Sequence, residues 1–183
     1  MNERTRLLEL LKTRSYERRK VKLASGAESD FYIDCKRVTL DAEGSALVGA
    51  ELLKKIREET PGVQAVGGPT LGADPIATAV SLTSFLKGSP MPAYIVRKEP
   101  KGHGTGQWIE GTENIPAGAK VVLVEDVVTS GSSSLKAIRH VRDAGYSVND
   151  VYVLVDREEG GRENLAREGV TLHALYRKGD FVS

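Results

Sequence analysis

The chain has 183 residues, of which 40% are hydrophobic and 28% are charged, and its formal net charge is +1. This length and composition predict one soluble globular domain with a sizeable core, and the small net charge excludes a global field that would hold nucleic acid or an anionic membrane. Cys35 is the only cysteine, which excludes an intrachain disulfide and a cysteine-rich zinc site and favours a reducing cytoplasm.

The N-terminal segment is charged and amphipathic, unlike the apolar core of a signal sequence. No apolar run approaches membrane-spanning length, so we expect a cytoplasmic protein without membrane or nucleic-acid partners. Asn2 or Thr5 is placed to cap a first helix, whose apolar face would comprise Leu7, Leu8, Leu10 and Leu11.

Two short strands are expected next, at 21–23 and 31–33, with Ser25-Gly26 between them as the turn of a hairpin or small subdomain. Phe31 and Tyr32 fit two interpretations. They are core aromatics, or they form a face for a planar base.

A helix is predicted over 41–60, ended by Pro61-Gly62, because apolar residues recur at helical spacing. A short strand at 65–66 then leads into a glycine-rich loop over 67–75. Asp74 is expected to cap the next helix, 76–86, with Pro75 at its first position. Backbone amides of this loop offer a place for a phosphate, although glycine and proline more often make only a turn.

The segment 97–111 follows a strand at 93–96 and combines glycines with basic side chains. Its candidate functional residues are Arg97, Lys98, Lys101 and His103. This composition indicates a mobile loop that closes over an anion, and a solvated basic loop is the alternative.

A buried strand starting at Val121 is predicted to end in two carboxylates, Glu125 and Asp126. Ligands of open α/β sheets collect at the carboxyl ends of the strands, so both acids fall where a substrate is expected. The next segment, Thr129 to Ser133, supplies hydroxyls, a glycine and the first amides of a helix marked by Leu135, Ile138 and Val141. Such a segment favours a bound phosphate.

Carboxylates would repel a phosphate, so they must serve another part of the ligand, and neighbouring acceptors suit a sugar diol. A phosphorylated ribose satisfies both halves of the pattern. The segment lacks the Gly-Lys-Ser/Thr ending of a Walker A loop and is not a GxGxxG dinucleotide loop.

Another buried strand is predicted over 151–155, followed by Arg157. An arginine at this edge suits a planar carboxylate, and a surface salt bridge with Glu158 or Glu159 is the alternative. A short helix around 164–167 and a strand at 170–175 complete the chain. His140 is expected on a helix surface and His173 within the last strand, and neither has a partner in the sequence that indicates catalysis.

Alternating strands and helices predict an α/β fold with a mainly parallel central sheet and helices on both faces. The run from Val121 to Ser133 resembles the phosphoribosyl-diphosphate motif of type I phosphoribosyltransferases. The order Arg-Lys-x-x-Lys-x-His-Gly from Arg97 to Gly104 is similar to the catalytic loop of the orotate phosphoribosyltransferase family. This resemblance implies a single phosphoribosyltransferase domain over 1–183, in which residues 1–40 mostly form a small hood subdomain and residues 41–183 the core.

The resemblance also implies the reaction, which is Mg²⁺-dependent transfer of ribose 5-phosphate from 5-phosphoribosyl 1-diphosphate to orotate in the de novo route to UMP. It further implies a homodimer with shared active sites, in which Mg²⁺ is held mainly through diphosphate, ribose and water and not directly by protein ligands. Activity on another base, or regulation by sensing phosphoribosyl diphosphate, remains an alternative.

Residue roles are carried over from the same resemblance. Catalysis would involve Lys101, Arg97, His103, Glu125 and Asp126. Phosphoribosyl diphosphate would bind these residues together with Lys98, Val127, Val128, Thr129, Ser130, Gly131, Ser132 and Ser133. Orotate would contact Thr129, Arg157, Tyr32 and Ile33.

Two positions depart from many family members, which carry lysines where this chain has Ala24 and Gly72. The diphosphate would then depend on backbone amides and the mobile loop, or Lys22 and Lys36 would compensate.

Overall fold

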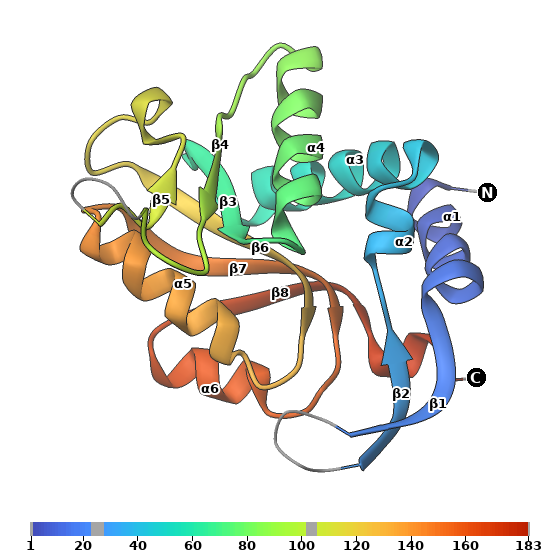
Figure 1. The fold of residues 1–183 in the computed structure, drawn as a ribbon. Helices are drawn as coiled ribbons and strands as arrows, with labels where there is room; N and C mark the ends of the chain where they lie inside the picture. Colours follow the sequence, from blue (N-terminus) through green and yellow to red (C-terminus); the bar gives the residue numbers. More distant parts are fainter. Residues whose placement is uncertain (1, 23–27, 102–105, 183) are drawn as a thin grey trace.

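The computed structural model describes residues 2–22, 28–101 and 106–182. Ser25-Gly26, Ala24 and His103 therefore lie outside the described residues. A six-stranded sheet has the order β5-β4-β3-β6-β7-β8, and β1 and β2 form a separate antiparallel pair (Figure 1). The strands are β1 Tyr16–Lys22, β2 Glu28–Ile33, β3 Ala65–Pro69, β4 Ala93–Val96, β5 Ile109–Glu110, β6 Lys120–Val128, β7 Ser147–Asp156 and β8 Thr171–Arg177. The α-helices are α1 Glu3–Leu10, α2 Lys36–Thr39, α3 Ala42–Glu59, α4 Ala73–Leu86, α5 Ser132–Asp143 and α6 Gly161–Arg167.

The central sheet is parallel except for β5, which runs antiparallel to β4. Alternate residues of the buried strands enter two separate cores because successive side chains point to opposite faces. Val122 and Val124 pack with residues of α1, α3 and α4, whereas Val121 and Leu123 pack with residues of α5 and α6. Helices cover both faces of the sheet, which confirms the predicted fold class (Figure 1).

The N-terminal segment packs into the first of these cores. Asn2 caps α1 by accepting a hydrogen bond from the backbone N–H of Thr5, and the helix continues as a π-helix over Leu11–Ser15. The paired strands β1 and β2 are longer than the sequence predicts. Phe181, near the C-terminus, places its ring 5.7 Å from that of Phe31 and 5.8 Å from that of Tyr16. The C-terminal segment therefore packs against the β1-β2 pair.

The expected glycine loop after Val66 is only partly a loop. β3 continues through Gly67, Gly68 and Pro69, and α4 begins at Ala73, so the prediction that Asp74 caps a helix starting at 76 is wrong. Asp74 lies in the first turn, where its side chain accepts a hydrogen bond from the Thr70 hydroxyl at 2.6 Å. Packing overrides the local turn preference of the glycines, because a Cβ on Gly68 would lie 2.1 Å from the backbone oxygen of Val124.

We expect Gly68→Ala to destabilise the fold by about 1–3 kcal/mol or more, since the obstructing atom is backbone and cannot rotate away. The midpoint of urea unfolding measures this change. Gly179→Ala is the matched control, because a Cβ there has no atom within 4 Å. Equal midpoints for the two variants would contradict the close packing of β3 on β6.

The later strands are also longer than predicted.

His140 and His173 both have partners in the fold. His140 is half-buried and its ring stacks on Trp108 at 3.9 Å, so it is not a free surface residue. His173 lies in β8 as expected, with Nε2 2.8 Å from Asp150 and Nδ1 2.6 Å from Glu59. These carboxylates lie far from His173 in sequence, which is why the sequence did not indicate them. Among the described residues, no helix has the length and apolar content required to span a membrane.

Candidate active site

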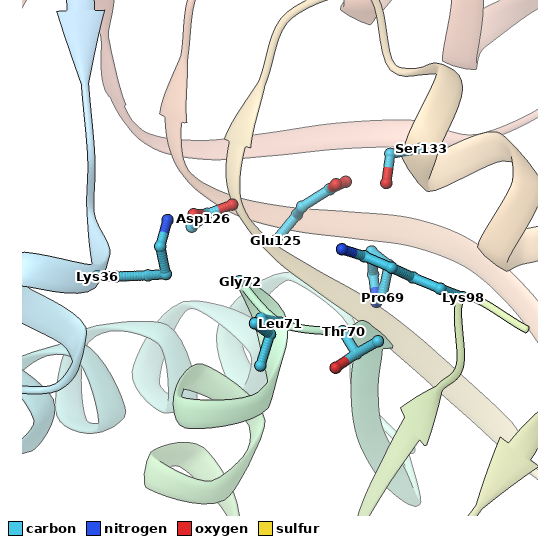
Figure 2. A pocket seen from close by; sticks show the side chains of 9 residues that line it. All are labelled: Lys36, Pro69, Thr70, Leu71, Gly72, Lys98, Glu125, Asp126 and Ser133. Atoms are coloured by element: carbon cyan, nitrogen blue, oxygen red, sulfur yellow. The ribbon is translucent and has the colours of Figure 1, made fainter.

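A cavity of about 370 Å³ lies at the carboxyl edge of the sheet, beside β3 and β6. Side chains from five segments of the chain meet around it (Figure 2). Its lining comprises Lys36, Pro69, Thr70, Leu71, Gly72, Lys98, Glu125, Asp126 and Ser133. Of the predicted site residues, the structure thus brings together Lys98, both acids and Ser133.

The sequence predicts that the strand ends in the two acids, but both lie within β6, which continues for two residues beyond Asp126. Glu125 is in register with Val153 of β7, and the strand continues to Val128. Because they are consecutive strand residues, the acids project differently. Glu125 accepts a hydrogen bond from the Ser134 hydroxyl of α5, whereas Asp126 faces Gly72 before α4.

Burial shapes the ionisation of both acids. Glu125 is only 7% exposed. Desolvation raises the pKa of its carboxyl group to about 7, despite hydrogen bonds from Ser134 and Ser133 that favour the charged form. Desolvation also raises the pKa of Asp126, while the Val127 N–H and the charge of Lys36 oppose this rise. Near neutral pH, the carboxylate charge at Glu125 therefore depends on its hydroxyl neighbours.

The segment after β6 forms the start of α5. Gly131 is the N-cap with φ 76°, a conformation that favours glycine, and Ser132 and Ser133 in the first turn are exposed. The first amides of a helix have no intrahelical acceptor, and the positive end of the helix dipole favours an anion there. This geometry suits a phosphate.

Other members of the predicted phosphate segment face elsewhere. Val127 packs against the first core and Val128 belongs to the second, so only their backbone atoms can meet a ligand. Thr129 is half-buried, and Ser130 is exposed with its carbonyl accepting a hydrogen bond from the Asn164 amide at 3.0 Å.

The basic segment after β4 forms an arm whose base is ordered by hydrogen bonds. The Arg97 N–H donates to the Trp108 carbonyl at 2.9 Å, and the Lys101 N–H donates to the Gln107 carbonyl at 3.1 Å. The Arg97 guanidinium pairs with Glu110 at 2.8 Å, so it does not line the cavity in this conformation. Lys101 is exposed and also lies outside the cavity lining.

Arg157 is buried, with 8% exposure, beneath the strand pair β1-β2. Its Nη2 donates to the Phe31 carbonyl and the Ser29 hydroxyl, both at 3.0 Å, and lies 3.2 Å from Glu159. The alternative salt bridge with Glu159 thus exists, but it is buried and not superficial. The buried Nε of Arg157 has no hydrogen-bond partner in the part of the chain that the structure describes.

None of the four predicted orotate residues lines the cavity of Figure 2. Tyr32 follows Phe31, which Arg157 holds, and its ring lies 3.7 Å from the Arg19 guanidinium carbon. Ile33 packs against the first core.

Residues 39–173 match the family model described as "Phosphoribosyl transferase domain". An orotate phosphoribosyltransferase of Sorangium cellulosum is 49% identical over 181 residues, covering 99% of this chain and 94% of that protein. The corresponding enzyme of Aquifex aeolicus is 44% identical, covering 100% of this chain and 99% of that protein. The chain belongs to the orotate phosphoribosyltransferase family.

The three-dimensional structure agrees with membership of the orotate phosphoribosyltransferase family. The Mycobacterium tuberculosis orotate phosphoribosyltransferase, solved in complex with 5-phospho-alpha-D-ribosyl 1-diphosphate, aligns with a TM-score of 0.80 at 36% identity, covering 100% of both chains. The activity of the present chain is accordingly that of an orotate phosphoribosyltransferase, a pentosyl transfer in pyrimidine biosynthesis.

In this member of the orotate phosphoribosyltransferase family, sequence reasoning missed Ser134. It is fully buried and donates to Glu125 from the first turn of α5. One signal was available. Ser134 shares the spacing of the buried residues Ile138 and Val141, which places it on the inner face of the helix. Its partner Glu125 was not predictable, because that contact depends on how α5 packs on β6.

We expect Ser134→Ala to raise the pKa of Glu125 above about 7, because the hydroxyl favours the charged carboxylate. The acid limb of the pH profile of kcat/KM for orotate should then move to higher pH, so that the loss of activity is larger at pH 7 than at pH 9. Ser89→Ala, at an exposed serine outside the cavity, is the control. An unchanged acid limb in Ser134→Ala would contradict the assignment.

The raised pKa of Glu125 should also make the stability of the protein depend on pH. The folded-state pKa of Glu125, about 7, exceeds its usual value of 4.5, so the folded state binds more protons between these pH values. Stability contributed by this group is therefore present at low pH and declines as pH rises through that window. Glu125→Gln should remove this part of the decline in urea unfolding.

Proposed function

We propose that the cavity beside β3 and β6 binds 5-phosphoribosyl 1-diphosphate and is where its ribose 5-phosphate is transferred to orotate, giving orotidine 5′-monophosphate and diphosphate. The observation that carries this proposal is the meeting of the acid pair, the start of α5 and Lys98 around one cavity. The amides and hydroxyls of Thr129 to Ser133 hold the 5-phosphate. Glu125 and Asp126 accept hydrogen bonds from the ribose hydroxyls.

The charges that develop during transfer explain the choice of residues. Breaking the ribose C1–O bond leaves positive charge on the sugar and negative charge on the departing diphosphate, and an enzyme gains most by stabilising these two centres. The acids lie next to the cationic ribose. Lys98, Arg97, Lys101 and His103 neutralise the diphosphate when the arm closes, which also excludes water from the sugar.

Mg²⁺ is the cofactor that we propose for this site. Among the described residues, no group of three or more His, Cys, Asp or Glu side chains is arranged to hold a metal. Two carboxylates do line the cavity, and Mg²⁺ is often bound through one or two carboxylates together with substrate phosphates and water. Mg²⁺ held mainly through the diphosphate, the ribose and water would lie next to Glu125 and Asp126, and it would supply positive charge to the diphosphate.

Residues 1–40 act, in this proposal, as a hood subdomain that carries the base pocket, and residues 41–183 form the core. Tyr32 and Ile33 face orotate from the hood, while Thr129 and Arg157 bind it from the core. Arg157 connects the two parts because it already holds the β2 carbonyl of Phe31. Its guanidinium suits the orotate carboxylate, since the planar group can donate paired hydrogen bonds.

The decisive assay follows the loss of orotate absorbance when the protein, Mg²⁺ and 5-phosphoribosyl 1-diphosphate are mixed. We expect turnover with orotate and none with adenine, hypoxanthine or uracil. Turnover with one of those bases but not with orotate would overturn the substrate assignment. Specific binding of operator-like DNA or RNA without turnover would instead favour the alternative of a regulator that senses phosphoribosyl diphosphate.

We also propose that the protein works as a cytoplasmic homodimer with shared active sites. Its single, buried cysteine suits a reducing compartment. One face of α4 exposes large apolar side chains, with Leu82 59%, Phe85 68% and Leu86 73% exposed. Clustered exposed apolar residues of this kind mark interaction surfaces. We propose that this face of α4 packs against a second copy of the chain.

Phe85→Asp should weaken this dimer, because a charge replaces an apolar side chain at its contact. Sedimentation equilibrium over a range of protein concentrations measures the effect, and specific activity should fall with dilution sooner than in the wild type. Val182→Asp, at an exposed residue near the C-terminus, is the control. A Phe85→Asp protein that remains as dimeric as the wild type would exclude α4 from the contact.

A further inference from the structure

Lys36 occupies a fixed position at the cavity. It opens α2 directly after the buried Cys35, whose Sγ lies 3.8 Å from the backbone oxygen of Asp126. The backbone of Lys36 is thus held against β6. Its side chain is 45% exposed and lines the cavity, with the ammonium group directed toward Asp126 (Figure 2). Like Lys98 and unlike Lys101, Lys36 already lines the cavity in this conformation.

The Lys36 ammonium is oriented but not fully occupied. Its Nζ lies 2.7 Å from Asp34 Oδ1, and the same oxygen accepts a hydrogen bond from the Lys36 backbone N–H at 3.2 Å. The hydrogen bond to Asp34 raises the pKa of Lys36, with further support from Asp126, so the group stays charged. An ammonium group has three donors. One donor to Asp34 leaves others for a ligand.

The wall formed by Thr70, Leu71 and Gly72 offers backbone but no cationic side chain. A Cβ on Gly72 would lie 2.5 Å from Asp126 Oδ1, so a larger residue at this position would displace the acid. The wall leads into α4, a 14-residue helix whose N-terminus carries partial positive charge. A diphosphate here would lie beside Asp126. Because both groups are anionic, a cation from another element is needed to offset their repulsion.

We propose that Lys36 is that cation, and that it binds the diphosphate group of the sugar substrate between α2 and the Thr70–Gly72 wall. This inference rests on the proposed function, because it assigns a ligand to the same cavity. Asp34 holds the ammonium in place before substrate binds, and Lys36 then stabilises the negative charge that grows on the departing diphosphate. Gly72 stands where many family members carry a lysine. At this position the geometry favours the Lys36 ammonium, together with backbone amides of the Thr70–Gly72 wall, as the group that replaces the missing charge.

Direct binding tests this role without requiring turnover. Titration of the wild-type protein with inorganic diphosphate and Mg²⁺ in a calorimeter gives the reference Kd. We expect Lys36→Ala to weaken diphosphate binding by about tenfold to a hundredfold, the range for losing a hydrogen bond to a charged group. Lys36→Arg should recover part of this loss because it keeps the charge. Lys87→Ala, at an exposed lysine after α4, should bind like the wild type.

Kinetics separates a ligand role from a merely structural one. In Lys36→Ala the KM for 5-phosphoribosyl 1-diphosphate should rise together with the Kd for diphosphate, whereas the KM for orotate should change little. If Lys36→Ala unfolds, Lys36→Gln keeps most of the side-chain stem and removes only the charge, and it should show the same loss of diphosphate binding.

The outcomes distinguish the two proposals. Diphosphate binding by both Lys36→Ala and Lys36→Gln as tight as in the wild type would overturn the role of Lys36, even if the wild type turns over orotate. A wild type that binds diphosphate through Lys36 but does not use orotate would support this inference and overturn the substrate assignment.

Discussion

Lys101→Ala should lower turnover about 10²–10³-fold at saturating substrates, the usual cost of removing one charged group that stabilises a transition state. Lys101 is exposed at the base of the arm and outside the cavity lining, which suits a residue that acts only after closure. The positive charge of Lys101 would stabilise the negative charge that develops on the departing diphosphate. In Lys101→Ala, kcat should therefore fall more than the affinity for substrate. Steady-state kinetics with both substrates varied measures the two effects.

A matched control is Lys136→Ala, which removes an exposed lysine from α5 and should leave kcat unchanged. A decrease of less than about threefold for Lys101→Ala would remove this residue from the catalytic set. Mixing Lys101→Ala with Glu125→Gln gives a further readout. If the arm acts in the active site of the neighbouring subunit, mixed dimers contain one intact site, and activity should reappear on mixing.

Arg157→Ala should reduce kcat/KM for orotate by about a hundredfold or more, since a hydrogen bond to a charged group contributes roughly 1.5–3 kcal/mol and a carboxylate accepts two. The same change removes the hydrogen bonds from Nη2 to Ser29 and Phe31 and leaves Glu159 without this partner. Stability should therefore fall as well, because a buried carbonyl and a largely buried carboxylate lose their donor. Thermal unfolding measures this second effect.

Two variants separate orotate binding from stability. Arg157→Lys keeps the charge but lacks the planar fork, so we expect it to restore stability more than kcat/KM. Arg139→Ala, which removes an exposed arginine 3.9 Å from Glu168, should change neither quantity. If Arg157→Ala lowers the unfolding temperature while the KM for orotate stays at the wild-type value, Arg157 only attaches β2 to the core.

Sequence alone was sufficient for the fold class and for the positions of most elements. The apolar run at Val121 to Val124 predicted a strand buried on both faces, and β4 lies at the predicted residues 93–96. These predictions succeed because side-chain periodicity is a local property that directly reflects which faces are buried. The glycines before α4 misled the local reasoning. Their lack of a side chain serves the close approach of β3 to β6, and this cannot be distinguished from a turn in sequence.

Only some of the residues that line the site could be predicted from the sequence. Glu125, Asp126 and Ser133 were identified as candidates because they follow one another in a short motif. Lys36 and Gly72 meet Asp126 from segments far apart in the chain, and Ser134 meets Glu125 across a helix-sheet contact. The protonation behaviour of Glu125 likewise depends on burial, which no local pattern reports.

Residue order thus determined which groups this protein possesses: an acid pair on a buried strand, hydroxyls at a helix start and a basic arm. Tertiary structure alone decided which of them face one another, and it turned Arg97 toward Glu110, Arg157 toward β2 and Lys36 toward the cavity. The physical reason is that hydrogen-bonding and apolar periodicity act over a few residues. Desolvation, ion pairing and close packing depend instead on neighbours that only the folded chain brings together.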